Sequence, residues 1–225
     1  MIVIHGENTA HSRKKLQELI TQAKTNSTAI TRLEAKRLTA ASLQEAMGGN
    51  SLFGEDKLII IEEIHSLPAS KRKKELIEQI ANSGLENLIL YEKRQLTATM
   101  LKKVGNPQVF EFKISNTLWK FLDQIGGPDK TKIIKLLRES ISQNDEFFVY
   151  TMIIRQIRML ITAKDGGVIK GAPFMITKLK GQANRFTLEQ LLKTHQQLFN
   201  IDIKQKNSQL SLSLGQELDL ILLKM

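Results

Sequence analysis

The chain has 225 residues, enough for one or two domains with an apolar core, and its 41% hydrophobic and 25% charged residues are ordinary for a globular protein. It contains no cysteine, which excludes disulfides and thiolate metal ligands and fits a reducing compartment. The net charge of +10 favours contact with a polyanion such as nucleic acid, although a generally basic surface is the simpler alternative.

The first residues, Met1 to Gly6, are not a basic leader followed by a long apolar stretch, so we expect a strand there and not a signal peptide. No run of the sequence approaches the ~18 apolar residues of a membrane span. We therefore expect a cytoplasmic protein that has no membrane partner.

Residues 1–113 alternate short apolar runs with amphipathic helical stretches. The runs are continuously apolar, which is typical of a parallel sheet covered by helices on both faces. Leu16 and Ile20 have helical spacing, and Ser42 with Glu45 forms a capping-box pattern before another helix. This alternation predicts an α/β doubly wound domain. The strand candidates are residues 2–4, 29–30, 58–61, 88–91 and 109–112.

Residues 114–225 contain helix signals only and predict an all-α bundle. The stretch 147–161 is apolar nearly all round, so we expect a central, buried helix there. Pro173 is expected in the first turn of a short helix, and Thr187 with Gln190 forms another capping box. The remaining helices are expected near residues 118–122, 133–141 and 214–222.

Two large apolar residues, Leu52 and Phe53, fall between the capped helix and the strand at 58–61, which places them in a loop. Full burial of each side chain would gain roughly 1.5–3 kcal/mol, so leaving both in water is unfavourable. Either the loop folds back and both residues pack on the protein's own sheet, or a partner covers them. The apolar pattern alone favours the first alternative.

The stretch 43–62 resembles the clamp-binding region of the delta subunit of bacterial DNA polymerase III. The resemblance extends over almost the whole chain. Residues 152–160 resemble an Arg-Gln-x-x-Arg helix in the C-terminal collar of that family, and Asp202 and Lys204 also match the collar. Other matching segments are residues 4–8, 88–92, 172–192 and 217–224.

The resemblance implies an AAA+-like parallel sheet followed by an all-α collar bundle. It implies that Leu52 and Phe53, with Ser51 and Met47 beside them, enter a hydrophobic pocket on the sliding clamp and open the ring. This reverses the preference for a loop that folds back. It also implies that the collar joins the chain to ATP-binding clamp-loader subunits, while this chain hydrolyses no ATP. The alternative is a non-specific nucleic-acid-binding module that does not act on a clamp.

The resemblance has one large departure. Members of the family usually carry a helical lid between the α/β domain and the collar. In this chain the last strand ends near Phe112 and the first collar helix begins near Asn116, which leaves no room for a domain of tens of residues. We therefore expect a delta-like subunit without the lid.

Motifs for nucleotide chemistry are incomplete. A phosphate-binding loop needs a second glycine and a lysine, and this chain has His11 and Ser12 at those positions after Gly6. Glu62 and Glu63 end a strand, but adjacent strand residues point to opposite faces and do not form a catalytic dyad. The four histidines show no ligand spacing. We predict no catalytic residue, cofactor or metal, and an enzyme on a degenerate nucleotide fold is the least supported hypothesis.

The densest basic run is Lys71, Arg72, Lys73 and Lys74. These residues fan around a helix, so the run is either a solvated helix start or a site of non-specific contact with DNA phosphates.

Arg155 and Arg158 lie one helical turn apart on an otherwise apolar helix. Because unpaired buried charges are costly, we expect both to pair with carboxylates, either inside the collar or at its subunit interface.

Overall fold

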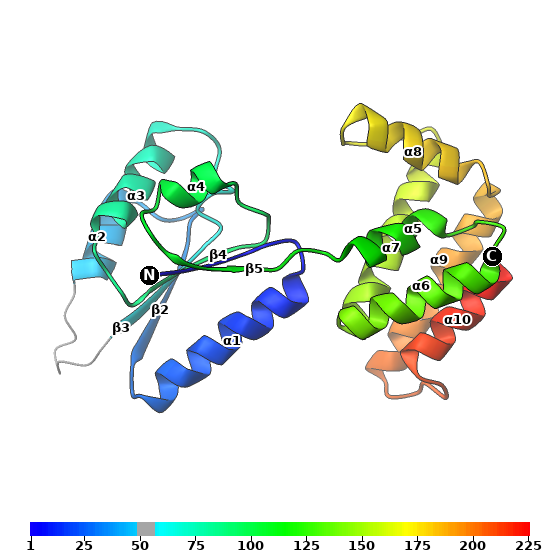
Figure 1. The fold of residues 1–225 in the computed structure, drawn as a ribbon, viewed down its shortest axis with the longest axis horizontal. Coiled ribbons are helices and arrows are strands. Elements are labelled where there is room, and N and C mark those ends of the chain that lie inside the picture. The colour runs from blue at the N-terminus through cyan, green and yellow to red at the C-terminus, as the bar shows by residue number, and fades with distance from the viewer. Residues whose placement is uncertain (49–56) are drawn as a thin grey trace. The chain divides into compact units, whose positions relative to one another are not determined.

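The computed structural model describes residues 1–48 and 57–225 (Figure 1). Ser51, Leu52 and Phe53 therefore lie outside the described residues. The chain divides into two compact units, Met1–Ile114 and Ser115–Met225. Residues 112–115 alone join the last strand of the first unit to the first helix of the second, so no lid is inserted at this point.

The first unit is built on a five-stranded sheet whose order is β2-β3-β4-β1-β5 and whose neighbouring strands all pair in parallel. The predicted α/β class is confirmed. Strand β4 is buried along its whole length, while the edge strands β2 and β5 are partly exposed, as expected for strands with one neighbour. The strands are β1 (Ile2–His5), β2 (Ala29–Glu34), β3 (Lys57–Glu62), β4 (Leu88–Glu92) and β5 (Gln108–Glu111).

Helices cover both faces of this sheet (Figure 1). Alternate strand residues point to opposite faces, so the continuous apolar runs supply two cores. Leu16 and Ile20 of α1 (Thr9–Thr25) pack in a cluster with Ile60. The opposite cluster gathers residues of α2 (Ala40–Gly48), α3 (Lys71–Asn82) and the short α4 (Ala98–Lys102), among them Leu43, Leu76 and Met100.

The start of α2 differs from the predicted capping box. Ser42 N donates to Thr39 Oγ1 over 3.1 Å, and Thr39 N donates to Ser42 Oγ over 3.0 Å. The box is therefore Thr39 with Ser42, and the prediction of Ser42 with Glu45 was wrong by one helical turn. Both pairs fit the sequence pattern, and the upstream pair satisfies the first free N–H groups of the helix.

The second unit is entirely helical within residues 115–225, as predicted. Helix α7 is its centre, because it packs against each of the other helices and buries eight of its residues. Pro173 stands in the first turn of α8, and the capping box of Thr187 and Gln190 opens α9, so both predictions are confirmed. The helices are α5 (Asn116–Gln124), α6 (Lys130–Gln143), α7 (Glu146–Lys164), α8 (Pro173–Ala183), α9 (Leu188–Lys206) and α10 (Leu214–Lys224).

Candidate functional site

The predicted clamp-binding residues lie at the junction of α2 and β3. Lys57 Nζ, at the start of β3, donates to the carbonyl oxygen of Ala46 over 2.9 Å. The last carbonyl groups of a helix have no partner inside the helix, so a cation is favourable there. This bond ties the two elements from which residues 49–56 depart. Met47 is half-buried and packs against the core beneath α2, so part of its side chain serves the fold.

The turn after β1 is filled by the protein's own groups. Gly6 N donates to Arg94 O over 3.1 Å, Asn8 N donates to Phe112 O over 3.0 Å, and Asn8 Oδ1 accepts from His11 N over 3.2 Å. A Cβ atom at Gly6 would lie 2.1 Å from Phe112 O. The backbone N–H groups that cradle phosphates in a phosphate-binding loop are therefore engaged by carbonyl and amide oxygens of this chain.

The two acidic residues at the end of β3 have separate partners. Arg13 Nη2 lies 3.2 Å from Glu62 Oε2, so Arg13 pairs with this carboxylate and is not simply part of a solvated helix face. Glu63 accepts from Ser66 Oγ over 2.8 Å and lies 3.5 Å from Lys93 Nζ. The carboxylates thus serve different contacts and do not form a pair.

A buried polar group that the sequence reasoning missed lies behind this edge. Glu92 is fully buried at the end of β4, and its Oε1 accepts from His65 N over 2.7 Å and lies 3.1 Å from His65 Nδ1. His5 Nδ1 accepts from Leu96 N over 3.2 Å. Burial lowers the pKa of His5, outweighing the opposite effect of Glu111. The signal in the sequence was a carboxylate that directly continues an apolar strand.

The basic run at the start of α3 divides into two pairs. Arg72 Nε donates to Leu38 O over 2.9 Å, and its Nη2 donates to Ala35 O over 2.7 Å. Lys73 Nζ donates to His65 O over 2.5 Å and to Leu67 O over 2.7 Å. Burial lowers the pKa of Lys73, with a further contribution from nearby Arg94. Arg72 and Lys73 thus hold neighbouring loops of their own unit.

Lys71 and Lys74 are the freely presented members of the run. Their Nζ atoms lie 3.8 Å from Glu75 Oε1 and 3.7 Å from Glu78 Oε1, and both lysine side chains are largely exposed. Such exposed helical pairs contribute little stability and are readily exchanged for other anions. Lys71 and Lys74 therefore remain the part of the run that could meet DNA phosphates, and this contact stays a prediction.

Arg155 and Arg158 lie on the exposed strip of α7. Gln156 between them points inward and donates from Nε2 to Gln182 Oε1 over 2.7 Å. The Arg-Gln-x-x-Arg pattern thus combines one internal amide with two surface cations. Within residues 115–225 neither arginine forms an ion pair, so pairing inside the collar is not observed. Pairing at a subunit interface stays a prediction.

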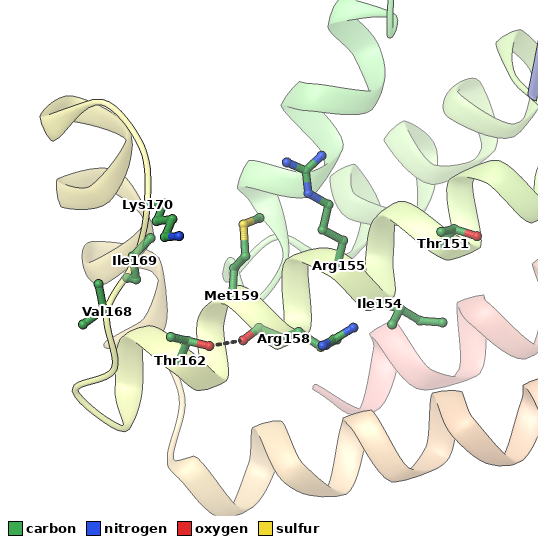
Figure 2. A pocket seen from close by; sticks show the side chains of 9 residues that line it. All are labelled: Thr151, Ile154, Arg155, Arg158, Met159, Thr162, Val168, Ile169 and Lys170. Atoms are coloured by element: carbon green, nitrogen blue, oxygen red, sulfur yellow. Dashed lines mark hydrogen bonds between the residues drawn. The ribbon is translucent and has the colours of Figure 1, made fainter. Parts of the chain in front are cut away.

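Both arginines line a pocket of about 390 Å³ between α7 and the segment that precedes α8 (Figure 2). Figure 2 shows Lys170 reaching over this pocket from that segment, with Met159 between Lys170 and Arg155. The lining residues are Thr151, Ile154, Arg155, Arg158, Met159, Thr162, Val168, Ile169 and Lys170.

Asp202 and Lys204, singled out in the collar, do not pair with each other. Asp202 Oδ2 accepts from Lys206 Nζ over 2.6 Å, one helical turn further along α9. Inside the bundle, the hydroxyl of Tyr150 donates to Leu198 O over 2.7 Å, and burial raises the pKa of Tyr150 to about 12. These contacts fix α7 against α9 and are structural.

Membrane-spanning helices and metal clusters are not found among residues 1–48 and 57–225. No helix in these ranges has the length and apolar character needed to cross a membrane. The same ranges contain no group of three or more His, Cys, Asp or Glu residues that could hold a metal ion.

Comparison with known proteins gives one family. A model of the C-terminal domain of the DNA polymerase III delta subunit matches residues 115–225, which is the whole helical unit. Among solved structures, a Bacillus subtilis DNA clamp loader delta protein (YqeN) aligns with 99% of this chain and 94% of its own, at 15% identity and a TM-score of 0.45, too low to support an inference. No curated protein matches. Through its helical unit, the chain belongs to the family defined by the C-terminal domain of the DNA polymerase III delta subunit.

Proposed function

We propose that this chain is a delta-like clamp-loader subunit that binds the sliding clamp during DNA replication and favours its open form. The observation that carries this proposal is the family match over the entire helical unit, residues 115–225. In this proposal the helical unit is the collar, which joins the chain to ATP-binding loader subunits.

The proposed contact with the clamp is the pair Leu52 and Phe53, flanked by Ser51 and Met47. The bond from Lys57 to Ala46 supports this proposal, because it fixes the ends of α2 and β3 from which that segment departs. An aromatic ring and a leucine that enter a desolvated pocket can each contribute about 2 kcal/mol or more when truncated.

Ring opening follows from preferential binding. A subunit that binds the open ring better than the closed ring shifts the equilibrium toward the open form, by no more than its difference in affinity for the two. The engaged N–H groups of Gly6 and Asn8 agree with a subunit that does this without ATP of its own. The nucleotide state of the neighbouring subunits would then decide when the clamp is held.

The test is the affinity of the purified full chain for the purified sliding clamp. We expect the double variant L52A/F53A to lose clamp binding, at roughly 30-fold for each residue. A matched control is L192A/F199A, because Leu192 and Phe199 are a leucine and a phenylalanine that are both 51% exposed on α9. Unchanged affinity in L52A/F53A, with folding intact, rejects the contact.

Non-specific DNA binding is the second candidate function. It is favoured by the net charge of +10 and by the exposed side chains of Lys71 and Lys74. It predicts binding of the isolated chain to DNA that weakens steeply with salt, and a smaller salt slope in K71E/K74E. Little binding at moderate salt would count against it.

A further inference from the structure

The pocket beside Arg155 and Arg158 has an unbalanced charge. Three of its lining residues are cationic, namely Arg155, Arg158 and Lys170, and none of the nine is acidic. Arg155 and Arg158 are three positions apart on α7, which brings their Cβ atoms to about 5–6 Å, and like charges at such spacing are mildly destabilising. The chain therefore keeps a locally unfavourable arrangement that a bound anion would relieve.

Other cations of the same helical unit are treated differently. Arg138 pairs with Asp219, and Lys178 Nζ lies 2.5 Å from Asp123 Oδ2. Their acids come from helices far away in the sequence. The fold can thus supply carboxylates to exposed cations, and within residues 115–225 it supplies none to Arg155 or Arg158.

The surroundings of the cations are apolar. Ile154, Met159, Val168 and Ile169 line the same pocket. Val168 is 90% exposed and Phe174, at the start of α8, is 73% exposed.

An adjoining pocket of about 270 Å³ shares Met159, Ile169 and Lys170 and adds Trp119 and Phe174. The two pockets therefore form a continuous surface in which apolar side chains surround the cationic groups.

This combination discriminates between classes of ligand. A nucleic-acid backbone offers phosphates, which satisfy cations, but gains nothing from the exposed Val168 and Phe174. A protein segment that carries both carboxylates and apolar side chains satisfies both features. Interfaces of this kind place large apolar residues at the centre and use charges for specificity.

We infer that this surface receives an acidic, apolar segment of a neighbouring clamp-loader subunit, whose carboxylates meet Arg155, Arg158 and Lys170 and whose apolar side chains cover Val168 and Phe174. This inference rests on the proposed function, because it assumes that the helical unit meets other loader subunits.

The first test uses charge reversal in the full chain. The variant R155E/R158E is compared with K132E/K135E, which changes the same charge at the same spacing on α6, where both lysines are exposed. The probe is the purified ATP-binding loader subunits of the same organism. We expect R155E/R158E to weaken their binding at least about tenfold, and K132E/K135E to leave it nearly unchanged.

The clamp affinity of both variants is measured in parallel and should equal that of the unchanged chain. If the unchanged chain fails to bind both the clamp and the loader subunits, the proposed function fails. If it binds them and both variants bind the loader subunits equally well, only this inference is overturned. If R155E/R158E loses DNA binding and keeps subunit binding, the surface serves phosphates and the inference is again overturned.

The second test identifies the chemistry of the occupant. The chain has no cysteine, so V168C carries a single thiol that can be labelled with a photoactivated crosslinker. We expect it to capture, in the assembled loader, a peptide of a neighbouring subunit that contains Asp or Glu together with apolar residues. A label on K135C serves as the control. Capture of a basic or uncharged peptide, of DNA, or of the same peptides from both positions overturns the inference.

Discussion

The two units of this protein treat their charged groups in opposite ways. In the α/β unit, Glu62, Glu92 and Arg72 are engaged by partners within that unit. In the helical unit, α7 presents Arg155 and Arg158 to solvent beside exposed apolar side chains. The difference indicates that the edge of the sheet where nucleotides commonly bind is stabilised as structure, while the helical unit keeps a surface suited to a partner.

The largest effect is expected where the α/β unit is most closed. Glu92→Ala removes the acceptor of His65 N in a fully buried position, so we expect a loss of about 3 kcal/mol in the free energy of unfolding. The variant R155A/R158A should change it by less than about 0.5 kcal/mol, since both side chains are exposed and unpaired within residues 115–225.

The readout separates the two units. Trp119, the single tryptophan, lies in α5 and reports the helical unit by fluorescence, while circular dichroism reports both. Glu92→Ala should shift the part of the dichroism transition that fluorescence does not follow. A Glu92→Ala protein as stable as the unchanged chain would show that the buried contact is not what closes this edge.

The pH dependence of stability should also differ between the units. The pKa of His5 is lowered in the folded state, so the unfolded chain binds the proton first as the pH falls below about 6.5. Stability contributed by neutral His5 is therefore present above that pH and is lost below it, with a slope of up to about 1.4 kcal/mol per pH unit until the folded protein is also protonated.

His5→Asn keeps a side-chain acceptor and removes this titration. We expect the stability curve of the variant to be flatter between pH 6.5 and lower values, measured by urea unfolding of the dichroism signal. Identical slopes in the two proteins would assign the pH dependence to other groups.

A smaller effect is expected within the basic run of α3. Arg72→Ala removes bonds to the carbonyl groups of Leu38 and Ala35, so we expect a loss of about 1 kcal/mol, with the partial exposure of these groups taken into account. Lys71→Ala should cost less than about 0.5 kcal/mol, since its ion pair is exposed. Thermal unfolding distinguishes them, and equal losses would contradict the division of the run into two pairs.

The sequence predicted the strands of the sheet well because their apolar runs are short, continuous and separated by helical spacing. It misplaced the box at α2 because Thr39 with Ser42 and Ser42 with Glu45 fit the same pattern, and only the observed helix start distinguishes them. It could not assign Arg72 a partner, because Ala35 and Leu38 are more than thirty positions away along the chain. Long-range contacts of this kind leave no local pattern.

The candidate surfaces divide in the same way. Spacing placed Arg155 and Arg158 on one turn of a helix, but only the packing of α7 could show which face of that helix meets solvent. Val168 and Lys170 complete the surface from a segment with no periodic signal, so sequence reasoning missed them.

The most direct test of a subunit that opens the clamp is the release of a closed clamp ring from nicked circular DNA by this chain alone, without ATP. We predict that the unchanged protein accelerates release and that L52A/F53A does not, while L192A/F199A behaves like the unchanged protein. Release at the spontaneous rate in the presence of saturating unchanged protein would contradict the account.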